Sequence, residues 1–238
     1  MKIAICDDEQ VYVDLLREKT EKLIKGRFNE KLTIVGYKKA SELIAAYPLE
    51  LFDVVFLDIN MPEMDGRKTA KHLRSLSMNL ILVYFSSYDE FVFDSFDASP
   101  IGYIRKTKLD EELEKVCYRI IRKYKEYNSL IKIETKEGES CLCPSKVWYI
   151  ESKRRYLIVS YGDDKFEKIK YPIKKMSELL ENKGFIRIHK SFLLNYRFIY
   201  IFEDKEVLLS DLKTRLPLTR NRIKEIRSIY FDWIGGRK

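Results

Sequence analysis

The feature that most constrains this chain is a pair of apolar runs that each end in carboxylates. The run Ile3–Cys6 is followed by Asp7 and Asp8, and the run Val54–Leu57 is followed by Asp58. Short apolar runs of this kind are typical of strands covered on both faces, and parallel strands end at the same edge of a sheet. The chain is therefore expected to gather these carboxylates at one edge of a buried sheet.

Strand and helix patterns alternate through the first half of the chain. Strands are expected at 2–6, 32–37, 54–58, 80–85 and 100–104. Helical spacing occupies 9–25, 41–47, 66–76, 89–96 and 109–125, and Pro48 is expected to stop the second of these helices. Five strands alternating with five helices in about 125 residues predict a doubly wound parallel α/β sheet.

Residues that suit phosphoryl chemistry follow successive predicted strands. Asp58 can act as a carboxylate nucleophile, and Asp7, Asp8 and Asp58 together offer the oxygen ligands that Mg²⁺ prefers. Lys106 can supply a positive charge to a phosphate oxygen, and Ser86 a hydroxyl hydrogen bond. A single strand-end Asp often merely caps the next helix, and a single Ser or Lys is usually solvated. Because ligands of this architecture bind at strand ends, the whole set favours one acidic site.

The excess positive charge is confined to the second half. Residues 1–125 contain 21 Lys and Arg against 21 Asp and Glu, whereas residues 126–238 contain the other 24 against 16. The second half therefore carries the whole net charge of +8, which favours a polyanion such as nucleic acid as its partner. Scattered Lys and Arg more often form only a solvated face, so this is a hypothesis about the partner.

The second half has a pattern of many short strands separated by turns. A mostly β domain is expected at 130–238, after a first domain at 1–125 and a short linker at 126–129. Strands are expected at 130–135, 147–151, 156–161, 166–171, 185–188, 198–202, 207–209 and 214–216, and helices at 172–182 and 221–233. Arg and Asn in loops can read base edges, while Lys mostly contacts phosphates. Candidate residues of this kind are Lys153, Arg154, Arg155, His189, Lys190, Asn195, Arg220 and Arg222.

Signals for targeting and redox chemistry are weak. No stretch approaches the roughly 20 apolar residues that cross a bilayer, and the N-terminus becomes acidic too early for a signal peptide. A cytoplasmic protein without a membrane partner is therefore expected. Cys141 and Cys143 are spaced unlike a redox motif or half of a zinc site, so packing is favoured over a redox role.

Residues 1–125 resemble the receiver domain of two-component response regulators, which has a flavodoxin-like or CheY-like fold. The resemblance lies in Asp7-Asp8, Leu57-Asp58-Ile59-Asn60-Met61-Pro62, Met64-Asp65-Gly66, Ser86, Tyr103 and Lys106. It implies that Asp58 is the phosphoacceptor. It also implies that Asp7, Asp8, Asp58 and the backbone carbonyl of Asn60 bind Mg²⁺.

The same resemblance assigns roles to three residues near the later strands. It implies that Ser86 and Tyr103 form a switch pair and that Lys106 contacts the phosphoryl group. The sequence departs from the family at Thr107, where the family usually has a proline after the lysine. A cis Lys–Pro bond is therefore impossible at this position, and a cis bond to threonine would be costly.

The second half resembles the LytTR DNA-binding domain over about residues 128–234. The resemblance lies in three separated segments in the right order, 148–152, 185–195 and 216–221. It implies an elongated β fold whose loops enter successive major grooves of DNA. Asn195 and Arg220 are then the best candidates for base or backbone contacts, and the loop Lys153–Arg155 is a third contact. His189 and Lys190 are candidates for phosphate contacts, although His189 could equally be a structural hydrogen-bonding residue.

Together the halves predict a response-regulator transcription factor that accepts a phosphoryl group from a sensor histidine kinase. Phosphorylation is expected to favour a homodimer whose two basic domains bind paired repeats in double-stranded promoter DNA. The chain is not expected to be an enzyme, apart from catalysing its own phosphorylation and dephosphorylation.

Two alternatives differ in chemistry. A phosphatase of the haloacid dehalogenase type would have Asp-x-Asp at its first strand, whereas Asp58-Ile59-Asn60 follows the third predicted strand. The basic domain could instead bind RNA, a membrane surface or an acidic protein. No aromatic-rich stacking motif of the common RNA-binding kinds and no strongly amphipathic basic helix is present, so promoter DNA is favoured.

Overall fold

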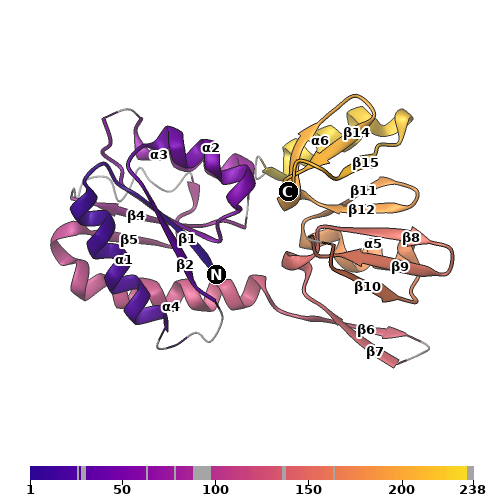
Figure 1. Cartoon of the computed structure of the whole chain (residues 1–238), viewed down its shortest axis with the longest axis horizontal. Helices are drawn as coiled ribbons and strands as arrows, with labels where there is room; N and C mark the ends of the chain where they lie inside the picture. Colours follow the sequence, from indigo (N-terminus) through magenta and orange to yellow (C-terminus); the bar gives the residue numbers. More distant parts are fainter. Residues whose placement is uncertain are drawn as a thin grey trace. The chain divides into compact units, whose positions relative to one another are not determined.

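The computed structural model describes residues 1–25, 27, 31–62, 64–77, 79–87, 98–135, 138–162 and 164–234. The chain divides into two compact units, Met1–Tyr127 and Asn128–Lys238, and each unit has its own sheets and core (Figure 1). Within the described ranges, every helix is too short or too polar to span a bilayer.

The first unit is a parallel sheet with helices on both faces. Its strands are β1 (Lys2–Cys6), β2 (Thr33–Tyr37), β3 (Val54–Leu57), β4 (Ile81–Ser86) and β5 (Gly102–Arg105). Its helices are α1 (Gln10–Lys25), α2 (Ala40–Glu50), α3 (Gly66–Leu76) and α4 (Leu109–Tyr127), with a short 3₁₀ helix η3 (Lys106–Lys108). The strands pair in parallel in the order β2-β1-β3-β4-β5, which confirms the predicted doubly wound sheet.

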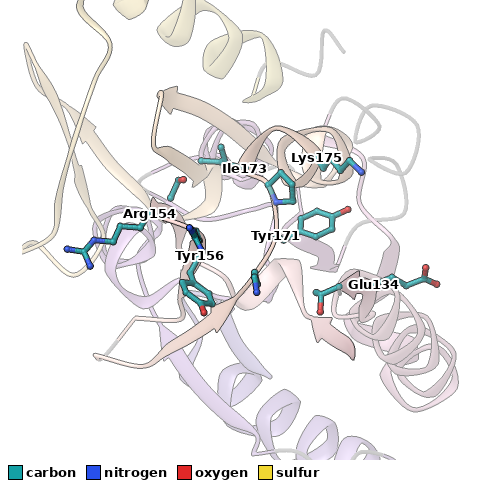
Figure 2. A pocket seen from close by; sticks show the side chains of 11 residues that line it. Glu134, Arg154, Tyr156, Tyr171, Ile173 and Lys175 are labelled. Atoms are coloured by element: carbon teal, nitrogen blue, oxygen red, sulfur yellow. The ribbon is translucent and has the colours of Figure 1, made fainter. Parts of the chain in front are cut away.

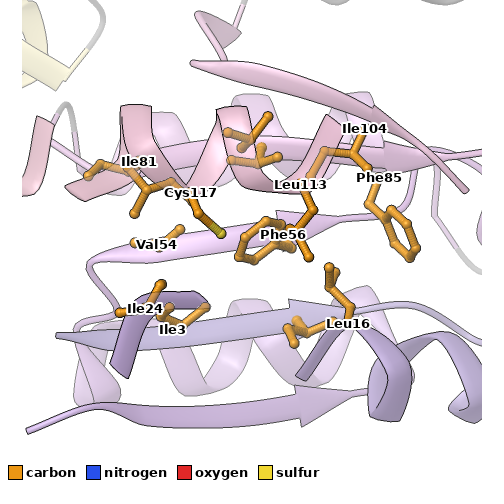
Figure 3. Packing of buried hydrophobic residues seen from close by; sticks show 14 of the residues in the cluster. Ile3, Leu16, Ile24, Val54, Phe56, Ile81, Phe85, Ile104, Leu113 and Cys117 are labelled. Carbon is orange, nitrogen blue, oxygen red and sulfur yellow. The ribbon is translucent and has the colours of Figure 1, made fainter. Parts of the chain in front are cut away.

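Two apolar layers cover the sheet, because successive side chains of a strand point to opposite faces. On one face Phe56 packs among residues of α1 and α4, including Leu16 and Leu113 (Figure 3). On the other face Leu57 packs with residues of α2 and α3, including Leu73. Full burial of one such side chain contributes about 1.5–3 kcal/mol to folding. Strand β3, buried along its whole length, is therefore a rigid support for Asp58 at its end.

Helix α2 continues through Pro48 to Glu50, so the prediction that it stops at Tyr47 is wrong. Pro48 removes only one N–H donor, and the last turn is retained by other contacts. Leu51 donates its N–H to the Tyr47 carbonyl at 2.9 Å, and the Tyr47 ring packs against Phe52. Leu51 itself has a left-handed φ of 49°, and the helix ends there.

Helix α4 runs to Tyr127, so the predicted linker at 126–129 begins inside a helix. Lys123 pairs with Glu126 at 3.0 Å, and Tyr127 packs against the core of the first unit. These contacts extend the helix by two residues beyond the predicted end at Lys125. The helix predicted at 89–96 lies outside the described residues.

The second unit is mostly β, as predicted, and its strands pair antiparallel. Its strands are β6 (Ile131–Thr135), β7 (Gly138–Leu142), β8 (Tyr149–Lys153), β9 (Tyr156–Ser160), β10 (Phe166–Ile169), β11 (Phe185–His189), β12 (Phe192–Asn195), β13 (Ile199–Phe202), β14 (Glu206–Leu209) and β15 (Arg215–Pro217). Its helices are α5 (Ile173–Leu180) and α6 (Ile223–Ile234), with 3₁₀ helices η4 (Pro144–Lys146), η5 (Glu181–Lys183), η6 (Tyr196–Phe198) and η7 (Arg220–Arg222). The sheets have the orders β10-β9-β8-β12-β11, β13-β14-β15 and β6-β7.

Strands β7 and β12 have no counterpart among the predicted strands. Apolar and polar residues alternate only weakly in the segment of β7. The segment forms a strand because it pairs with β6 in a hairpin, with Ile131 opposite Leu142. Strand β12 follows β11 after a turn of only Lys190 and Ser191, which is too short to interrupt the apolar pattern. Strands β11 and β12 pair as a hairpin, but in the sequence they look like one continuous apolar segment.

Candidate functional site

An acidic pocket lies at the carboxyl edge of the parallel sheet, where the predicted residues come together. The register pairs Cys6 with Leu57, so Asp7 and Asp58 leave adjacent strands side by side. The N–H of Asp58 donates to the Cys6 carbonyl at 2.9 Å and fixes this junction. The exposed fraction is 0% for Asp7 and 4% for Asp58. Two carboxylates buried so closely require a nearby cation.

Lys106 provides positive charge inside this pocket. Its Nζ lies 2.7 Å from Asp58 Oδ2 and 2.8 Å from Asp7 Oδ2, and its exposed fraction is 9%. The ring of Tyr12 covers the ammonium, with 4.1 Å between Nζ and the ring centroid. The peptide bond from Lys106 to Thr107 is trans. With Thr107 in place of the usual proline, the Lys106 ammonium therefore still lies within hydrogen-bonding distance of Asp58.

Burial governs the protonation of these groups. Burial raises the pKa of Asp7 to about 6, with hydrogen bonding and charge from Lys106 opposing the rise and the charge of Asp58 adding to it. Burial alone would lower the pKa of Lys106, but its bonds with Asp58 and Asp7 outweigh that effect and raise the pKa. The pocket is thus short of positive charge, and a further cation would relieve the repulsion between its carboxylates.

Asp8 completes a set of donors that suits a metal ion. Carboxylate oxygens of Asp7, Asp8 and Asp58 all lie within 4.8 Å of one another. Asp8 is exposed while the other two are buried, so the set opens to solvent on one side. Mg²⁺ typically binds one or two carboxylates together with waters and phosphate oxygens. The donors and the missing positive charge therefore both fit Mg²⁺.

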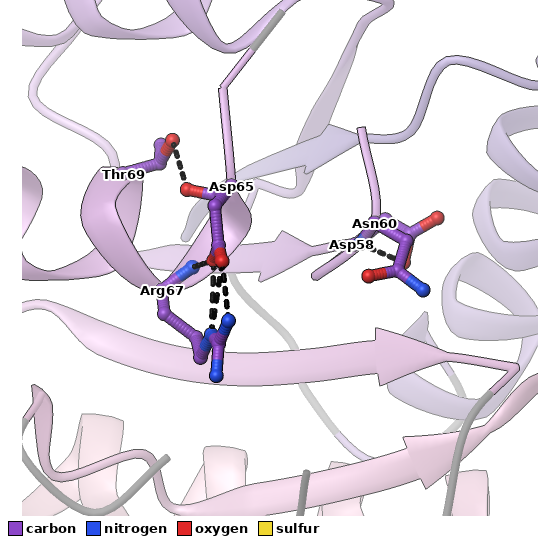
Figure 4. Close-up of polar contacts among 5 residues, drawn as sticks. All are labelled: Asp58, Asn60, Asp65, Arg67 and Thr69. Carbon is purple, nitrogen blue, oxygen red and sulfur yellow. Dashed lines mark hydrogen bonds and ion pairs between the residues drawn. The ribbon is translucent and has the colours of Figure 1, made fainter. Parts of the chain in front are cut away.

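The loop between β3 and α3 is shaped around Asp58. The N–H of Asn60 donates to Asp58 Oδ1 at 3.1 Å, so the carboxylate is oriented by its own loop (Figure 4). Asp65 caps α3 by accepting from the N–H of Arg67 at 2.7 Å, and it also pairs with the Arg67 guanidinium. A Cβ added at Gly66 would lie 2.0 Å from the Asp58 carbonyl oxygen. A larger residue there would displace the backbone that carries Asp58.

Ser86 and Tyr103 lie on the neighbouring strands β4 and β5. Ser86 is fully buried, and its Oγ has no hydrogen-bond partner in the part of the chain that the structure describes. Tyr103 is half-buried, and its ring packs against Tyr84 with 6.5 Å between centroids. A buried polar group without a partner costs about 1–3 kcal/mol, so the Ser86 hydroxyl would gain from an acceptor placed in the pocket.

Glu9 and Tyr12 belong to this pocket although the sequence did not single them out. Glu9 Oε1 lies 3.6 Å from Lys106 Nζ, and Tyr12 covers the same ammonium. Glu9 directly precedes α1, and Tyr12 lies in its first turn. Their position could have identified them, because the first turn of a helix after a strand lies at the edge where ligands bind.

In the second unit, the antiparallel sheet carries two basic turns at one end. The segment Lys153–Arg155 forms the exposed turn between β8 and β9, and Arg154 has a left-handed φ of 57°. The N–H of Ser152 donates to the Ser191 carbonyl at 2.8 Å, just before this turn. The turn between β11 and β12, where Lys190 is exposed, therefore lies beside it (Figure 1).

A third basic segment joins this end of the sheet. The N–H of Thr219 donates to the Ile188 carbonyl at 2.9 Å, which ties the start of η7 to the end of β11. Arg220 and Arg222 are exposed beyond this bond, and Arg222 pairs with Glu225 at 2.8 Å. These three segments, Lys153–Arg155, Lys190 and Arg220–Arg222, are termed the basic end of the sheet.

Asn195 is not part of this exposed surface, which corrects the prediction that it contacts DNA. It lies at the far end of β12 and is 4% exposed. Its Nδ2 donates to the carbonyls of Pro144 and Val147 at 3.1 and 2.9 Å, and its Oδ1 accepts from the N–H of Arg197 at 3.0 Å. The amide is fully used in holding η4 and η6 against β12, which is a structural role.

His189 contributes to the shape of the turn that carries Lys190. Its Nδ1 accepts from the N–H of Ser191 at 3.3 Å, and its ring contacts Phe192. Arg187 donates to the Lys190 carbonyl at 2.8 Å from the same strand. One ring nitrogen of His189 is therefore engaged within the turn.

Comparison with known proteins divides the chain as the structure does. The model of the response regulator receiver domain matches residues 3–117, and that of the LytTr DNA-binding domain matches residues 137–230. The transcriptional regulatory protein YpdB of Escherichia coli strain K12 is 22% identical over 251 residues, covering 96% of this chain and 99% of YpdB. The sensory transduction protein LytT of Bacillus subtilis strain 168 is 23% identical over 248 residues, covering 96% and 98%.

Among solved structures, a LytTr DNA-binding domain from Bacillus cereus is 26% identical, with a TM-score of 0.33, covering 45% of this chain and 97% of that one. The two domain models together match most of this chain, and the chain covers almost the whole length of YpdB and LytT. The chain belongs to the two-component response regulators of the LytTR family, with an N-terminal receiver domain and a C-terminal LytTR DNA-binding domain.

Proposed function

We propose that Asp58 accepts the phosphoryl group from a sensor histidine kinase and that this event controls promoter binding. The observation that carries the proposal is the buried contact of 2.7 Å between Lys106 and Asp58, beside Asp7 and Asp8. An Asp58 oxygen attacks phosphorus, the bond from phosphorus to the donor's imidazole nitrogen breaks, and its electron pair stays on that nitrogen. The acyl phosphate then lies beside the Lys106 ammonium.

The residues around Asp58 prepare this transfer. Asp7, Asp8, Asp58 and the backbone carbonyl of Asn60 are the proposed ligands of Mg²⁺. When bound, Mg²⁺ supplies positive charge that stabilises the transferring phosphoryl group. Lys106 binds a phosphoryl oxygen as a second positive charge. Because these groups belong to the receiver itself, it catalyses its own phosphorylation from small phosphodonors and its own dephosphorylation.

Ser86 and Tyr103 transmit the change at Asp58 to the surface. The buried Ser86 hydroxyl lacks a partner among the described residues, and a phosphoryl oxygen would provide one. Ser86 moves toward this oxygen, and Tyr103 repacks inward. The altered surface around β4 and β5 favours a homodimer.

The basic end of the sheet is the proposed DNA-contacting surface. Lys153–Arg155 and Lys190 lie on adjacent exposed turns, and Arg220 is exposed beside them, where a guanidinium can read a base edge. Arg222, paired with Glu225, is proposed to contact the backbone, and His189 can offer its second ring nitrogen to a phosphate. In the homodimer, two such surfaces bind paired repeats in promoter DNA by raising the effective concentration of the second site.

Promoter DNA is proposed over RNA or an acidic protein because the family's LytTR domain binds DNA and the charges form a row of turns. We place the domain boundary after Tyr127, where the compact units meet in sequence. Since the DNA target lies in the cytoplasm, we propose that the protein acts there.

The proposal is tested by phosphorylation of the Asp58→Asn variant with a small phosphodonor. Incubation of the full chain with radiolabelled acetyl phosphate and Mg²⁺ should label the wild type and leave Asp58→Asn unlabelled. The exposed carboxylate of Asp110 provides a matched control, because Asp110→Asn removes an equal charge outside the pocket and should be labelled normally. Retained labelling of Asp58→Asn would exclude Asp58 as the phosphoacceptor.

A further inference from the structure

A groove of about 520 Å³ opens beside the turn between β8 and β9 in the second unit. Arg154, Arg155 and Tyr156 line one wall. Lys170 and Tyr171, which lie between β10 and α5, and Lys175 of α5 line another. Figure 2 shows Arg154, Tyr156, Tyr171 and Lys175 around this space. These six residues are termed the Tyr156 groove.

The Tyr156 groove has a strong excess of positive charge. Arg154, Arg155, Lys170 and Lys175 contribute four basic groups to its lining, and among the described residues that line the space Glu134 is the acidic one. The four basic residues are all exposed, so their charges reach solvent and can meet a ligand as large as a duplex. An open groove of this charge suits a polyanion better than it suits a small enclosed ligand.

The register of β10 places the groove at the basic end of the sheet. Strand β10 runs antiparallel to β9 with Ile169 opposite Leu157, so Lys170 leaves β10 where Tyr156 enters β9. Lys170 therefore continues the row of basic turns on the side away from η7. The groove also shares Arg154 and Arg155 with the turn already assigned to DNA.

The length of this row decides which part of DNA the groove can meet. The five strands β10-β9-β8-β12-β11, spaced by about 4.8 Å, make the row about 19 Å long. The major groove of B-DNA is about 12 Å wide. If the central turns enter a major groove, the basic groups at the β10 end of the row lie over the sugar–phosphate backbone that borders it.

The walls of the groove match that part of the duplex. The Tyr156 ring is held in place by Lys168, whose Nζ lies 3.8 Å from the ring centroid. Tyr156 and Tyr171 offer apolar surface between the charged groups, as deoxyribose requires between successive phosphates. Lys170 and Lys175 can each bind a phosphate as a point charge.

We propose that the Tyr156 groove is a phosphodiester subsite that extends the DNA contact one strand beyond the turn between β8 and β9. Lys170 and Lys175 bind backbone phosphates there and do not read sequence. The inference rests on the proposed DNA-contacting surface and adds a segment to it that loop charge alone did not reveal.

The test compares two double variants of the full chain that lose equal charge at opposite ends of the sheet. Lys170→Ala/Lys175→Ala removes the groove lysines, and Lys146→Ala/Lys183→Ala removes two exposed lysines that precede β8 and β11. The probe is a duplex selected by the wild-type protein from a random-sequence pool. Affinity is measured between about 50 and 200 mM salt, where each phosphate contact contributes about −0.9 to the slope of log K against log salt.

The groove variant should lower the magnitude of the slope by about 2 and shorten the hydroxyl-radical footprint at one end of each half-site. The control variant should keep the wild-type slope and footprint. A wild-type slope and footprint for the groove variant, or an equal loss in both variants, would overturn the subsite.

A third double variant separates this inference from the proposed function. If Lys153→Ala/Lys190→Ala weakens binding and the groove variant does not, the DNA-contacting surface stands and only the subsite fails. If the wild type selects no duplex from the pool, the proposed DNA binding and the subsite fail together.

Discussion

Charged groups are buried in the acidic pocket and exposed at the basic end of the sheet. Lys106 lies 2.7–2.8 Å from Asp58 and Asp7, and strand ends and a tight loop fix all three before any ligand binds. Lys153–Arg155 and Lys190 instead project from turns into solvent. Buried charges depend on one another for stability, whereas exposed charges act by their number and position. Substitutions in the pocket should therefore change stability and function, and those at the basic end should change binding alone.

The largest effect is expected when Lys106 is removed, because this leaves buried carboxylates without their ammonium. In metal-free buffer, Lys106→Gln should destabilise the receiver by about 3 kcal/mol. Calorimetry of the full chain should detect the loss, and Mg²⁺ should recover part of it. Lys108→Gln, an exposed lysine of the same 3₁₀ helix, is the control and should change stability little. Equal, small effects of both variants would show that the pocket does not need its cation.

Substitution of Asn195, a buried amide in the basic half, should change stability as substitutions in the acidic pocket do, and unlike substitutions of exposed residues nearby. Asn195→Ala leaves two backbone carbonyls and one N–H without their partner, which should cost about 2 kcal/mol. Urea unfolding followed by tryptophan fluorescence reports this unit, since both tryptophans, Trp148 and Trp233, belong to it. Asn221→Ala, which truncates an exposed amide, should leave the unfolding midpoint unchanged. An unchanged midpoint for Asn195→Ala would contradict this structural role.

The stability of the receiver should also depend on pH through the pocket. The folded pKa of Asp7 is raised from 3.8 to about 6, so its contribution to stability is present at low pH and lost as pH rises through that value. With metal removed, Asp7→Asn should therefore stabilise the receiver on the order of 2 kcal/mol at neutral pH. The difference should disappear near pH 4. Calorimetric scans across this range check the sign, and a destabilised variant at neutral pH would contradict it.

The smallest expected effect is on binding and leaves stability unchanged. Arg220→Ala should weaken binding to the selected duplex by about 1–2 kcal/mol and weaken binding to a scrambled duplex much less. Lys224→Ala, in the first turn of α6, removes an exposed charge nearby and serves as the control. Titration of both duplexes measures the ratio. An equal loss on the two duplexes would reduce Arg220 to a phosphate contact.

The pocket could be predicted from the sequence because the fold fixes it. Once two apolar runs are taken as parallel strands, Asp7 and Asp58 must meet at one edge, and β5 brings Lys106 to the same place. Tyr12 was missed because only its position in the first turn of α1, and not its residue type, points to the pocket. The helix through Pro48 was missed because the packing of Tyr47 overrides a local rule.

The basic end could be predicted only in part, because a residue that the sequence places in or near a loop need not have an exposed side chain. Asn195 is a polar residue at the end of a strand and close to Arg197, yet its amide is buried in bonds with Pro144 and Val147, some 50 residues earlier in the chain. Lys170 was overlooked because it joins the basic turns only through the pairing of β10 with β9. Both outcomes depend on long-range strand pairing that no local pattern contains.

The measurement that most directly tests the account asks whether the buried site controls the exposed one. Affinity of the full chain for the selected duplex is measured with Mg²⁺, in the presence and absence of beryllium fluoride as a phosphoryl mimic, for the wild type and Asp58→Asn. Beryllium fluoride should tighten wild-type binding about tenfold or more by favouring the homodimer on paired repeats, and it should leave Asp58→Asn unchanged. Equal affinities for the wild type in both conditions, or the same gain in Asp58→Asn, would contradict the account.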